Sequence, residues 1–487
     1  MANRPADVDS EFEEDAAAGK APGGDAEGAR GADAEAGRSP GVDAETPPRR
    51  TGLPVLGSTI SFARWGIDFT DELRPHGDVV GYRALGQEFV AVFDPDLVET
   101  VLVSRNDEFH KGDFETAFGE LVAPEGVAFT EGDQWRRQRR LLQSAFAPAE
   151  VRTYADAMAD EAAALASGWD DGEVVELRDA LSTFALRVLT RALFDLEFGD
   201  ERAAVVREAT RALADVADPS AYALRSVVPS WLPIGDDRRY ELAMDDLSAL
   251  VERLVEERRS DAGAGDAADR DDLLSTLAAA EYPNGERMTP EEVKDQLVTF
   301  LFAGHETTAT ALTYACWLLA GHPNARRRLD AELDAELDGR DPAFGDVPAL
   351  DETEAIAREA MRLYPPAPIL YREPLEETVL GGYRIPSDAT LQLSAYGIHR
   401  DGRWWSEPAS FRPERWLDDR ERPEYAYFPF GGGPRHCLGM RFAMTELQIA
   451  LAALARRVEF DRVTESLDPS MGVTLDPGAV EVRVRKR

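Results

Sequence analysis

Lysine is nearly absent from this sequence. Its 487 residues hold 54 Lys plus Arg against 92 Asp plus Glu, a formal net charge of −38, and the lysines are Lys20, Lys111, Lys294 and Lys486. Such a charge argues against nucleic acid as a partner. Crowded carboxylates repel one another unless molar salt shortens the Debye length to about 3 Å. We therefore expect a halophilic host; a high-GC coding bias would explain the arginines but not the acids.

Cysteine and uninterrupted apolar runs are scarce as well. The two cysteines, Cys316 and Cys437, are too few for a disulfide framework and are not spaced for a zinc site, which favours a reducing compartment. No apolar signal segment follows the first residues. The most apolar long stretch, 297–320, carries His305 and Glu306 in its middle, which argues against a membrane span. We expect a soluble, cytoplasmic protein.

The composition changes near residue 48. Residues 1–48 are mostly Ala, Gly, Asp, Glu and Pro and bury too little surface to offset their ordering entropy, so they are predicted to form a disordered acidic tail. Residues 49–487 are predicted to form one folded domain. Strand-like runs lie at 89–93 and 391–394, and helical spacing of apolar residues is found at 149–167, 173–197, 201–217, 239–260 and 271–281. This pattern predicts a mainly α fold with small β-sheets.

The longest predicted helix has clear ends. Thr289, Pro290 and Glu292 form a T-x-x-E capping box with proline at the first turn, and Gly321 with Pro323 ends the helix. About 31 residues at 1.5 Å each span roughly 46 Å, enough to cross a domain. The helix is apolar on nearly all sides except at residues 304–308, Gly-His-Glu-Thr-Thr.

A glycine-rich loop, residues 428–441, carries the second cysteine. It places Cys437 at the start of an amphipathic helix predicted at 438–456, where free backbone N–H groups and the helix dipole lower a thiol pKa and favour thiolate. Such a cysteine suits metal ligation, and Arg435 adds a permanent cation nearby. The alternative is a structural cysteine buried after a flexible turn.

This loop resembles the haem-binding loop of the cytochrome P-450 monooxygenases, F-x-x-G-x-R-x-C, at Phe430, Gly433, Arg435 and Cys437. The resemblance covers about residues 50–487 with the family's motifs in order. It implies that Cys437 is the thiolate ligand of haem b, iron protoporphyrin IX, with Gly439 also beside the cofactor. It further implies the cytochrome P-450 fold over the catalytic domain 49–487, with haem between the long central helix and the C-terminal cysteine loop and helix.

The centre of the long helix, residues 303–308, resembles the family signature A/G-G-x-D/E-T. The resemblance implies that Gly304 opens a groove for dioxygen and that Thr307 and Glu306 relay protons. An acid and an alcohol inside an apolar helix cost free energy unless they are used or satisfied by the backbone, which is the alternative here. A zinc-protease reading fails because position 309 is Ala, not the second His of H-E-x-x-H.

Two further motifs concern structure and cofactor binding. Glu359 and Arg362 match E-x-x-R, a pair that alone is common on solvated helices, and with Arg415 they are implied to form a buried structural network. Trp135 and Arg139, spaced to share a helix face, resemble the family's propionate-binding helix. Arg372 falls where the family supplies another such arginine, which with Arg435 makes three cations for two carboxylates. The alternative for residues 135–140 is a solvated basic helix.

The resemblance implies a monooxygenase that inserts one oxygen atom from O2 into a small apolar substrate, such as a fatty acid, an isoprenoid or a carotenoid. No reductase domain is fused, so we expect a ferredoxin-type donor with its reductase, docking on Arg136, Arg137, Arg140 and Arg441. Pocket walls are expected at 117–124, 218–232, 367–370, Phe300 and Ala303. The alternative function is a non-catalytic haem-thiolate sensor with His305 as a sixth ligand.

Overall fold

The structure is a computed structural model that describes residues 44–54, 56–217, 237–263, 272–279, 281–282, 285–418 and 420–487. All of them belong to one compact unit, Val42–Arg487. The predicted disordered tail lies almost wholly outside the described residues and stays a prediction. Its last residues are described: the carbonyls of Glu45 and Pro48 accept hydrogen bonds from Arg384 N and Gly81 N, both at 2.8 Å. The described chain therefore packs on the domain a few residues before position 49.

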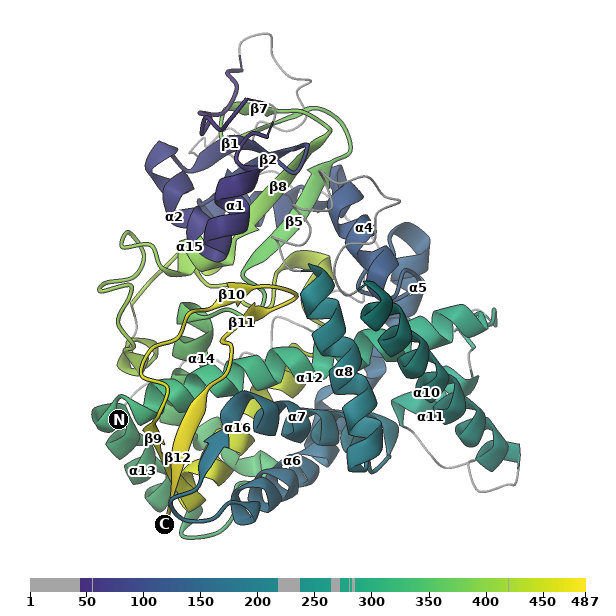
Figure 1. Cartoon of the computed structure of the whole chain (residues 1–487), viewed down its shortest axis with the longest axis vertical. Helices are drawn as coiled ribbons and strands as arrows, with labels where there is room; N and C mark the ends of the chain where they lie inside the picture. Colours follow the sequence, from purple (N-terminus) through teal and green to yellow (C-terminus); the bar gives the residue numbers. More distant parts are fainter. Residues whose placement is uncertain are drawn as a thin grey trace, which may run out of the picture. The chain divides into compact units, whose positions relative to one another are not determined.

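The largest sheet has five strands in the order β1-β2-β8-β5-β3. These strands are β1 (Val79–Ala84), β2 (Gln87–Val92), β8 (Ala389–Ser394), β5 (Ile369–Pro374) and β3 (Phe109–His110). The hairpin of β1 and β2 places Val80 opposite Ala91, and β2 pairs in parallel with β8, Val90 opposite Leu391. Figure 1 shows α1 (Thr59–Trp65), α2 (Phe69–Leu73) and α15 (Ala395–His399) beside this sheet. Because β5 pairs with β8, Arg372 on β5 is held rigidly at the edge of the helical part.

Three smaller sheets complete the strands. One has the order β4-β12-β9, with β4 (Val174–Glu176), β12 (Glu481–Lys486) and β9 (Val458–Arg462). The others are the pairs β6 (Thr378–Leu380) with β7 (Tyr383–Ile385), and β10 (Ser470–Met471) with β11 (Leu475–Asp476). The β10–β11 hairpin matters below because it borders a second cavity.

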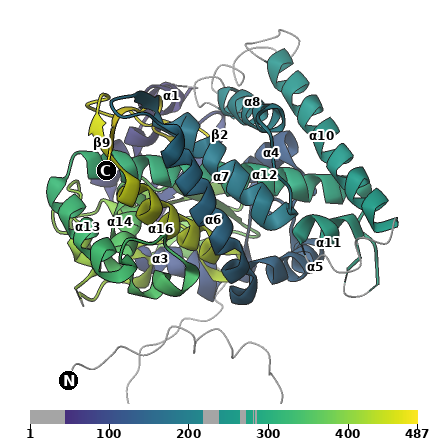
Figure 2. The ribbon, with the colours of Figure 1, turned by 90° about the horizontal axis from the view of Figure 1, so that it is seen from below.

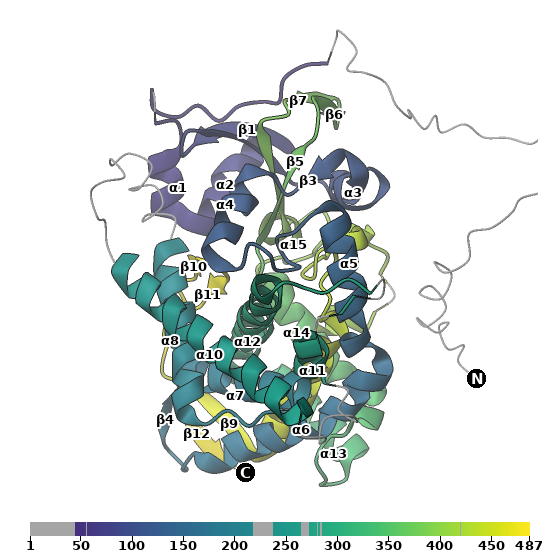
Figure 3. The ribbon, with the colours of Figure 1, turned by 90° about the vertical axis from the view of Figure 1, so that its right-hand side faces the viewer.

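The long helix α12 (Pro290–Ala320) has the 31 residues that the sequence predicts. The capping box is confirmed: Glu292 N donates to Thr289 Oγ1 at 3.1 Å and Thr289 N donates to Glu292 Oε2 at 2.8 Å. Figure 3 shows α12 nearly end-on, with α7 (Leu177–Phe194), α10 (Asp237–Gly263) and α14 (Asp351–Leu363) around it. Most of its side chains are buried. The helix lies between the main cavity and a second cavity, both described below.

The helices predicted at 149–167, 201–217, 239–260 and 271–281 correspond to α6, α8, α10 and α11, whereas α3, α4 and α13 were not predicted. The helix predicted at 173–197 is the exception: its first residues form β4, and the Glu176 side chain caps α7 by accepting from Arg178 N and Asp179 N at 3.2 and 2.6 Å. Figure 2 shows α6 and α16 side by side. The other helices are α3 (Pro95–Glu99), α4 (Gly112–Val122), α5 (Gly132–Leu142), α6 (Pro148–Gly168), α8 (Asp200–Ala217), α11 (Leu273–Ala279), α13 (Pro323–Leu337) and α16 (Met440–Arg457).

A buried carboxylate ties α14 to the segment before the cysteine loop. Arg362 donates to both oxygens of Glu359 at 2.8 Å, and both side chains are fully buried. Arg415 Nε and Trp416 Nε1 each donate to the same carboxylate at 3.0 Å. Arg362 also donates to the carbonyl of His399 at 2.8 Å. Both oxygens of the Glu359 carboxylate accept hydrogen bonds, so the free-energy cost of burying this charge is compensated.

Candidate functional site

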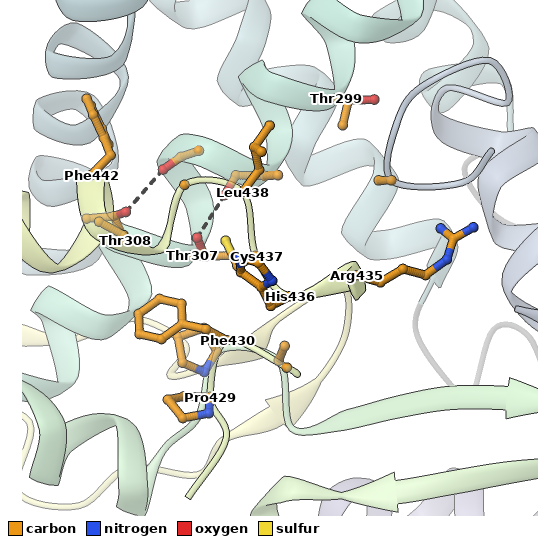
Figure 4. A pocket seen from close by; sticks show the side chains of 18 of the residues that line it. Thr299, Thr307, Thr308, Pro429, Phe430, Arg435, His436, Cys437, Leu438 and Phe442 are labelled. Carbon is orange, nitrogen blue, oxygen red and sulfur yellow. Dashed lines mark hydrogen bonds between the residues drawn. The ribbon is translucent and has the colours of Figure 1, made fainter. Parts of the chain in front are cut away.

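A cavity of about 360 Å³ lies between α12, β5, α5 and the cysteine loop. Figure 4 shows Cys437 and His436 on this loop, Thr307 and Thr308 on α12, and Arg435 extending away from the cysteine. Trp135, Gly433 and Glu306 do not line the cavity. The expected site residues that do line it are Arg139, Gly304, Thr307, Arg372, Phe430, Arg435, Cys437 and Gly439.

The cysteine loop is shaped by its glycines. Gly433 has φ +62°, and a Cβ there would lie 1.8 Å from the carbonyl oxygen of Leu102. A Cβ on Gly432 would lie 2.4 Å from the Tyr425 ring. The loop then closes on itself, because Cys437 N donates to Phe430 O at 2.8 Å. These contacts fix the backbone conformation of the loop, which places Cys437 in the lining of the cavity.

The predicted lowering of the Cys437 thiol pKa is not seen. Burial raises the pKa of this thiol, and the Gly439 N–H and the Arg139 guanidinium oppose that rise only in part. The helix α16 begins at Met440 rather than at 438, so the thiol lies before the helix and gains less from its dipole than the sequence suggested. A bound metal cation reverses this balance, because a coordinating thiol is deprotonated.

Cations gather at one end of the cavity. Arg139, Arg372 and Arg435 all line it. Burial lowers the pKa of Arg435 to about 10, and its guanidinium carbon lies 4.4 Å from the centre of the Trp135 ring. Arg139 lies 5.8 Å from the same ring. Trp135 itself lies outside the cavity, where its ring contacts both arginines and holds them in place.

Lys111 is a cavity residue that the sequence analysis missed. It pairs with Glu115, whose Oε1 lies 3.7 Å from Arg372 Nη1, and both Lys111 and Glu115 line the cavity. Burial lowers the pKa of Lys111. The one available signal in the sequence was the rarity of lysine. A lysine retained among only four in the chain is a candidate for a specific role.

These residues fit a haem. One end of the cavity offers four cations, Lys111, Arg139, Arg372 and Arg435, against the single acid Glu115, which suits a group with two carboxylates. The middle offers the thiol of Cys437, a ligand for iron. The rest of the lining is largely apolar, as the ring of such a group requires.

Three threonines of α12 line the cavity, Thr299, Thr307 and Thr308, and the last two lie near Cys437. Thr307 Oγ1 donates to Ala303 O at 2.8 Å and Thr308 Oγ1 donates to Gly304 O at 3.1 Å. Both hydroxyl hydrogens are used within the helix, so the oxygens present lone pairs to the cavity. Gly304 permits a close helix contact, because a Cβ there would lie 2.6 Å from Leu189 Cδ1.

Glu306 and His305 lie on the other side of α12. Arg178 Nη2 donates to Glu306 Oε1 at 2.6 Å, and Glu306 lines a separate cavity beside the β10–β11 hairpin. His305 is fully buried, its Nδ1 bonds to Leu301 O, and it does not line the main cavity. The sensor alternative named His305 as a sixth ligand, and the structure does not place it there.

The wall above the cysteine is apolar. Val127, Phe300, Ala303, Ala367 and Leu370 line it, so Phe300, Ala303 and part of 367–370 lie where the sequence analysis expected them. Residues 117–124 do not line this cavity. The expected wall at 218–232 lies outside the described residues.

The basic residues of α5 differ in their pairing. Arg136 pairs with Asp133 at 2.8 Å and Arg137 with Glu286 at 2.5 Å. Arg140 on α5 and Arg441 on α16 are exposed, and within the described part of the chain neither has a hydrogen-bond or ion-pair partner. The charge available on this face is therefore that of Arg140 and Arg441.

Comparison with known proteins gives consistent matches. A family model described as cytochrome P-450 matches residues 47–482. Cyclooctatin synthase of Streptomyces melanosporofaciens is 36% identical over 409 residues, covering 83% of this chain and 88% of that protein. Cyclooctat-9-en-7-ol 5-monooxygenase of the same organism is 35% identical over 412 residues, covering 83% and 87%. Pentalenene oxygenase of Streptomyces avermitilis is 34% identical over 405 residues, covering 82% and 88%.

A solved structure supports the fold. Retinoic acid bound cyanobacterial CYP120A1 superposes with a TM-score of 0.80 at 23% identity, covering 91% of this chain and 100% of that one. No helix among the described residues is long and apolar enough to cross a membrane.

The glycine geometry predicts a sharp difference within the cysteine loop. Gly433→Ala forces a side chain into left-handed backbone and against Leu102 O, so we expect it to destabilise the protein by at least about 2 kcal/mol in denaturant unfolding. Gly439→Ala is the matched control, because its φ is −88° and the nearest atom, Phe146 Cε1, is 3.6 Å from the added Cβ. Equal losses in the two variants would contradict the prediction.

Proposed function

Because the chain belongs to the cytochrome P-450 family and is a haem-dependent monooxygenase that uses O2 and a separate redox partner to oxygenate an apolar substrate, we propose that this substrate is a terpenoid. The observation that carries the proposal is the apolar wall of Val127, Phe300, Ala303 and Leu370 above Cys437. The relatives named cyclooctatin synthase, cyclooctat-9-en-7-ol 5-monooxygenase and pentalenene oxygenase support it.

The geometry favours a terpenoid over a fatty acid. A fatty acid needs a cation for its carboxylate at the substrate end of the cavity. The cations that line the cavity are Lys111, Arg139, Arg372 and Arg435, and these suit the carboxylates of the cofactor. A compact hydrocarbon or alcohol needs only apolar surface, which the wall supplies.

The following roles are part of the proposal. Cys437 ligates the iron of haem b, and Phe430, Gly433 and Gly439 shape the loop that carries it. Arg139, Arg372 and Arg435, with Lys111, bind the haem carboxylates, while Trp135 orients two of these arginines. Glu359, Arg362 and Arg415 form the structural network that holds the loop segment.

When bound, the haem supplies the dioxygen chemistry, to which the thiolate ligand contributes electron density that favours O–O cleavage. The chain supplies position and protons. Gly304 lines the cavity and lets Leu189 pack closely against α12, and Thr307 Oγ1 presents a lone pair to the cavity that accepts or orders a proton there. Glu306 holds a carboxylate on the far side of α12, next to Thr307 in the chain, where solvent protons reach it.

The thiolate assignment is tested by exchanging the two cysteines separately. In Cys437→Ser the ferrous carbonyl complex loses the Soret position typical of thiolate ligation, and hydroxylation is abolished, because a hydroxyl does not replace the thiolate. Cys316→Ala is the matched control, since Cys316 is buried away from the cavity and burial raises its thiol pKa to about 12. A thiolate-type band that survives in Cys437→Ser would overturn the assignment.

The substrate class is tested by optical titration of the holoenzyme at molar salt. Cyclic terpene hydrocarbons and alcohols should shift the Soret band with Kd values at least about tenfold below those of linear fatty acids, a difference of about 1.4 kcal/mol. Ala303→Phe should remove the shift by filling the cavity. Tighter binding of fatty acids, or no shift with any terpenoid, would reject the terpenoid proposal.

We also propose that the redox partner is an acidic ferredoxin served by its own reductase, and that the protein works in the cytoplasm. Arg140 and Arg441 are exposed, unpaired among the described residues and close in sequence to Arg139 and Cys437. In a chain of net charge −38, they offer a local site of opposite sign for an acidic partner. The salt adaptation expected from the composition belongs to the same proposal.

Charge reversal tests this docking surface. Arg140→Glu and Arg441→Glu should each slow reduction by the ferredoxin about tenfold at low salt and less at molar salt, because the attraction is screened. Substrate titration should not change. Arg253→Glu on α10 is the matched control, an exposed arginine with the same change in charge. Equal slowing by all three variants would place the partner elsewhere.

A further inference from the structure

His305 is a fully buried side chain with one nitrogen unpaired. Its Nδ1 bonds to the carbonyl of Leu301 one turn earlier on α12. Its Nε2 is buried and has no hydrogen-bond partner among the described residues. Nε2 lies 3.8 Å from Glu306 Oε2. A buried polar atom without a partner is rare enough to require an explanation.

The hydrogen-bond pattern determines the tautomer. A carbonyl oxygen only accepts, so Nδ1 carries the hydrogen, and the Nε2 of neutral His305 is then a bare acceptor. It faces Glu306 Oε2, which is also an acceptor when the carboxylate is ionised. The buried Nε2 is therefore an acceptor that faces a second acceptor with no donor between them, which is a mismatch. One proton between Nε2 and Oε2 removes the mismatch.

The charges around His305 control this proton. Burial lowers the pKa of His305, and Arg178 from α7 and Arg207 from α8 lower it further. Glu306 on its own helix and the Leu301 carbonyl act in the opposite direction. Asp476 on β11 forms an ion pair with Arg178, with 2.9 Å between Asp476 Oδ1 and Arg178 Nε. This pairing weakens the lowering of the His305 pKa by Arg178. The net effect lowers the pKa of His305, and Glu306 is the largest of the influences that oppose this lowering.

Solvent reaches this pair from a second cavity of about 360 Å³. Polar residues line it on three sides: Thr210 and Asp215 from α8, Arg178 from α7, and Ser470 and Thr474 from the β10–β11 hairpin. Glu306 lines it too, while Thr307 lines the main cavity on the opposite side of α12. Protons from water in the second cavity thus meet Glu306 first, with His305 Nε2 3.8 Å behind it, before they meet Thr307.

We propose that His305 Nε2 and Glu306 Oε2 share one exchangeable proton, taken from the second cavity, and that His305 is a positioning residue that keeps this proton on α12 beside Thr307. The proposal rests on the proposed monooxygenase function. The step moves a proton from hydronium in the second cavity to Glu306 Oε2 and on to His305 Nε2, leaving water behind, and no electrons are transferred. Sequence reasoning assigned His305 no such part.

The tautomer and the shared proton are tested by nitrogen-15 NMR. The sample is the full-length holoenzyme in its diamagnetic ferrous carbonyl form, labelled at histidine, and His305→Gln identifies the His305 signals. We expect a hydrogen on Nδ1 throughout, and protonation of Nε2 at a pH about one to two units higher in the wild type than in Glu306→Gln. His399 is an internal control, because its buried Nε2 already accepts from Phe428 N at 2.9 Å.

An Nε2 hydrogen at high pH, or the same midpoint in the wild type and in Glu306→Gln, would overturn the proposal. These outcomes need no turnover, so they are independent of the substrate and of the monooxygenase reaction. They separate failure of the shared proton from failure of the proposed function, which would show as no oxygenated product from the wild type at any pH.

Turnover gives the second readout. The proton is lost as pH rises through the His305 pKa, so product formed per O2 consumed should fall at lower pH in His305→Gln than in the wild type, by about one to two units. A merely structural role would reduce this ratio equally at all pH values. An unchanged pH profile, or a uniform loss, would contradict the proposal.

Discussion

The position of the Cys437 sulfur depends on the buried carboxylate of Glu359. Arg362, Arg415 and Trp416 all donate to it, and Arg362 continues to the carbonyl of His399. The ring of His399 in turn accepts from Phe428 N, the start of the cysteine loop. Loss of one member leaves a buried charge unpaired, which costs about 3–5 kcal/mol. Because the loss of any member costs this much free energy, the network favours a single arrangement. The close contacts of Gly433 with Leu102 and of Gly432 with Tyr425 then position the loop that carries the thiol.

Electrostatics is the second constraint, because the chain is strongly acidic and its haem is anionic. Cations are therefore concentrated where carboxylates of the cofactor are expected, and burial makes them costly to leave unpaired: it lowers the pKa values of both Arg435 and Lys111. Trp135 and Glu115 offset part of that cost by stacking and pairing. Outside the cavity, Arg136 and Arg137 are neutralised by acids, whereas Arg140 and Arg441 are exposed and unpaired among the described residues, as the proposed docking surface requires.

Local sequence signals predicted the elements whose causes are local. The capping box of Thr289 and Glu292, the stop at Gly321 and the order of motifs all correspond to what the structure shows. Other features were missed. Lys111 enters the cavity through tertiary packing, the Cys437 thiol pKa is dominated by burial, and α7 starts late because Glu176 prefers to cap it. The first two depend on tertiary packing, which spacing alone does not reveal. The Glu176 cap is local, since it accepts from Arg178 N and Asp179 N, and that sequence signal was overlooked.

The acid and the alcohol of α12 illustrate the limit best. As neighbours in sequence, Glu306 and Thr307 read as one relay, yet an α-helix turns by about 100° per residue, so they face different cavities. Most side chains of the helix between Leu297 and Leu319 are buried and apolar, so this part of α12 separates the second cavity from the main one. Residues 304–308 are the polar interruption through which, in the proposed relay, a proton crosses. A proton store at His305 therefore belongs on the wet side, where it is refilled without opening the oxygen-binding side to solvent.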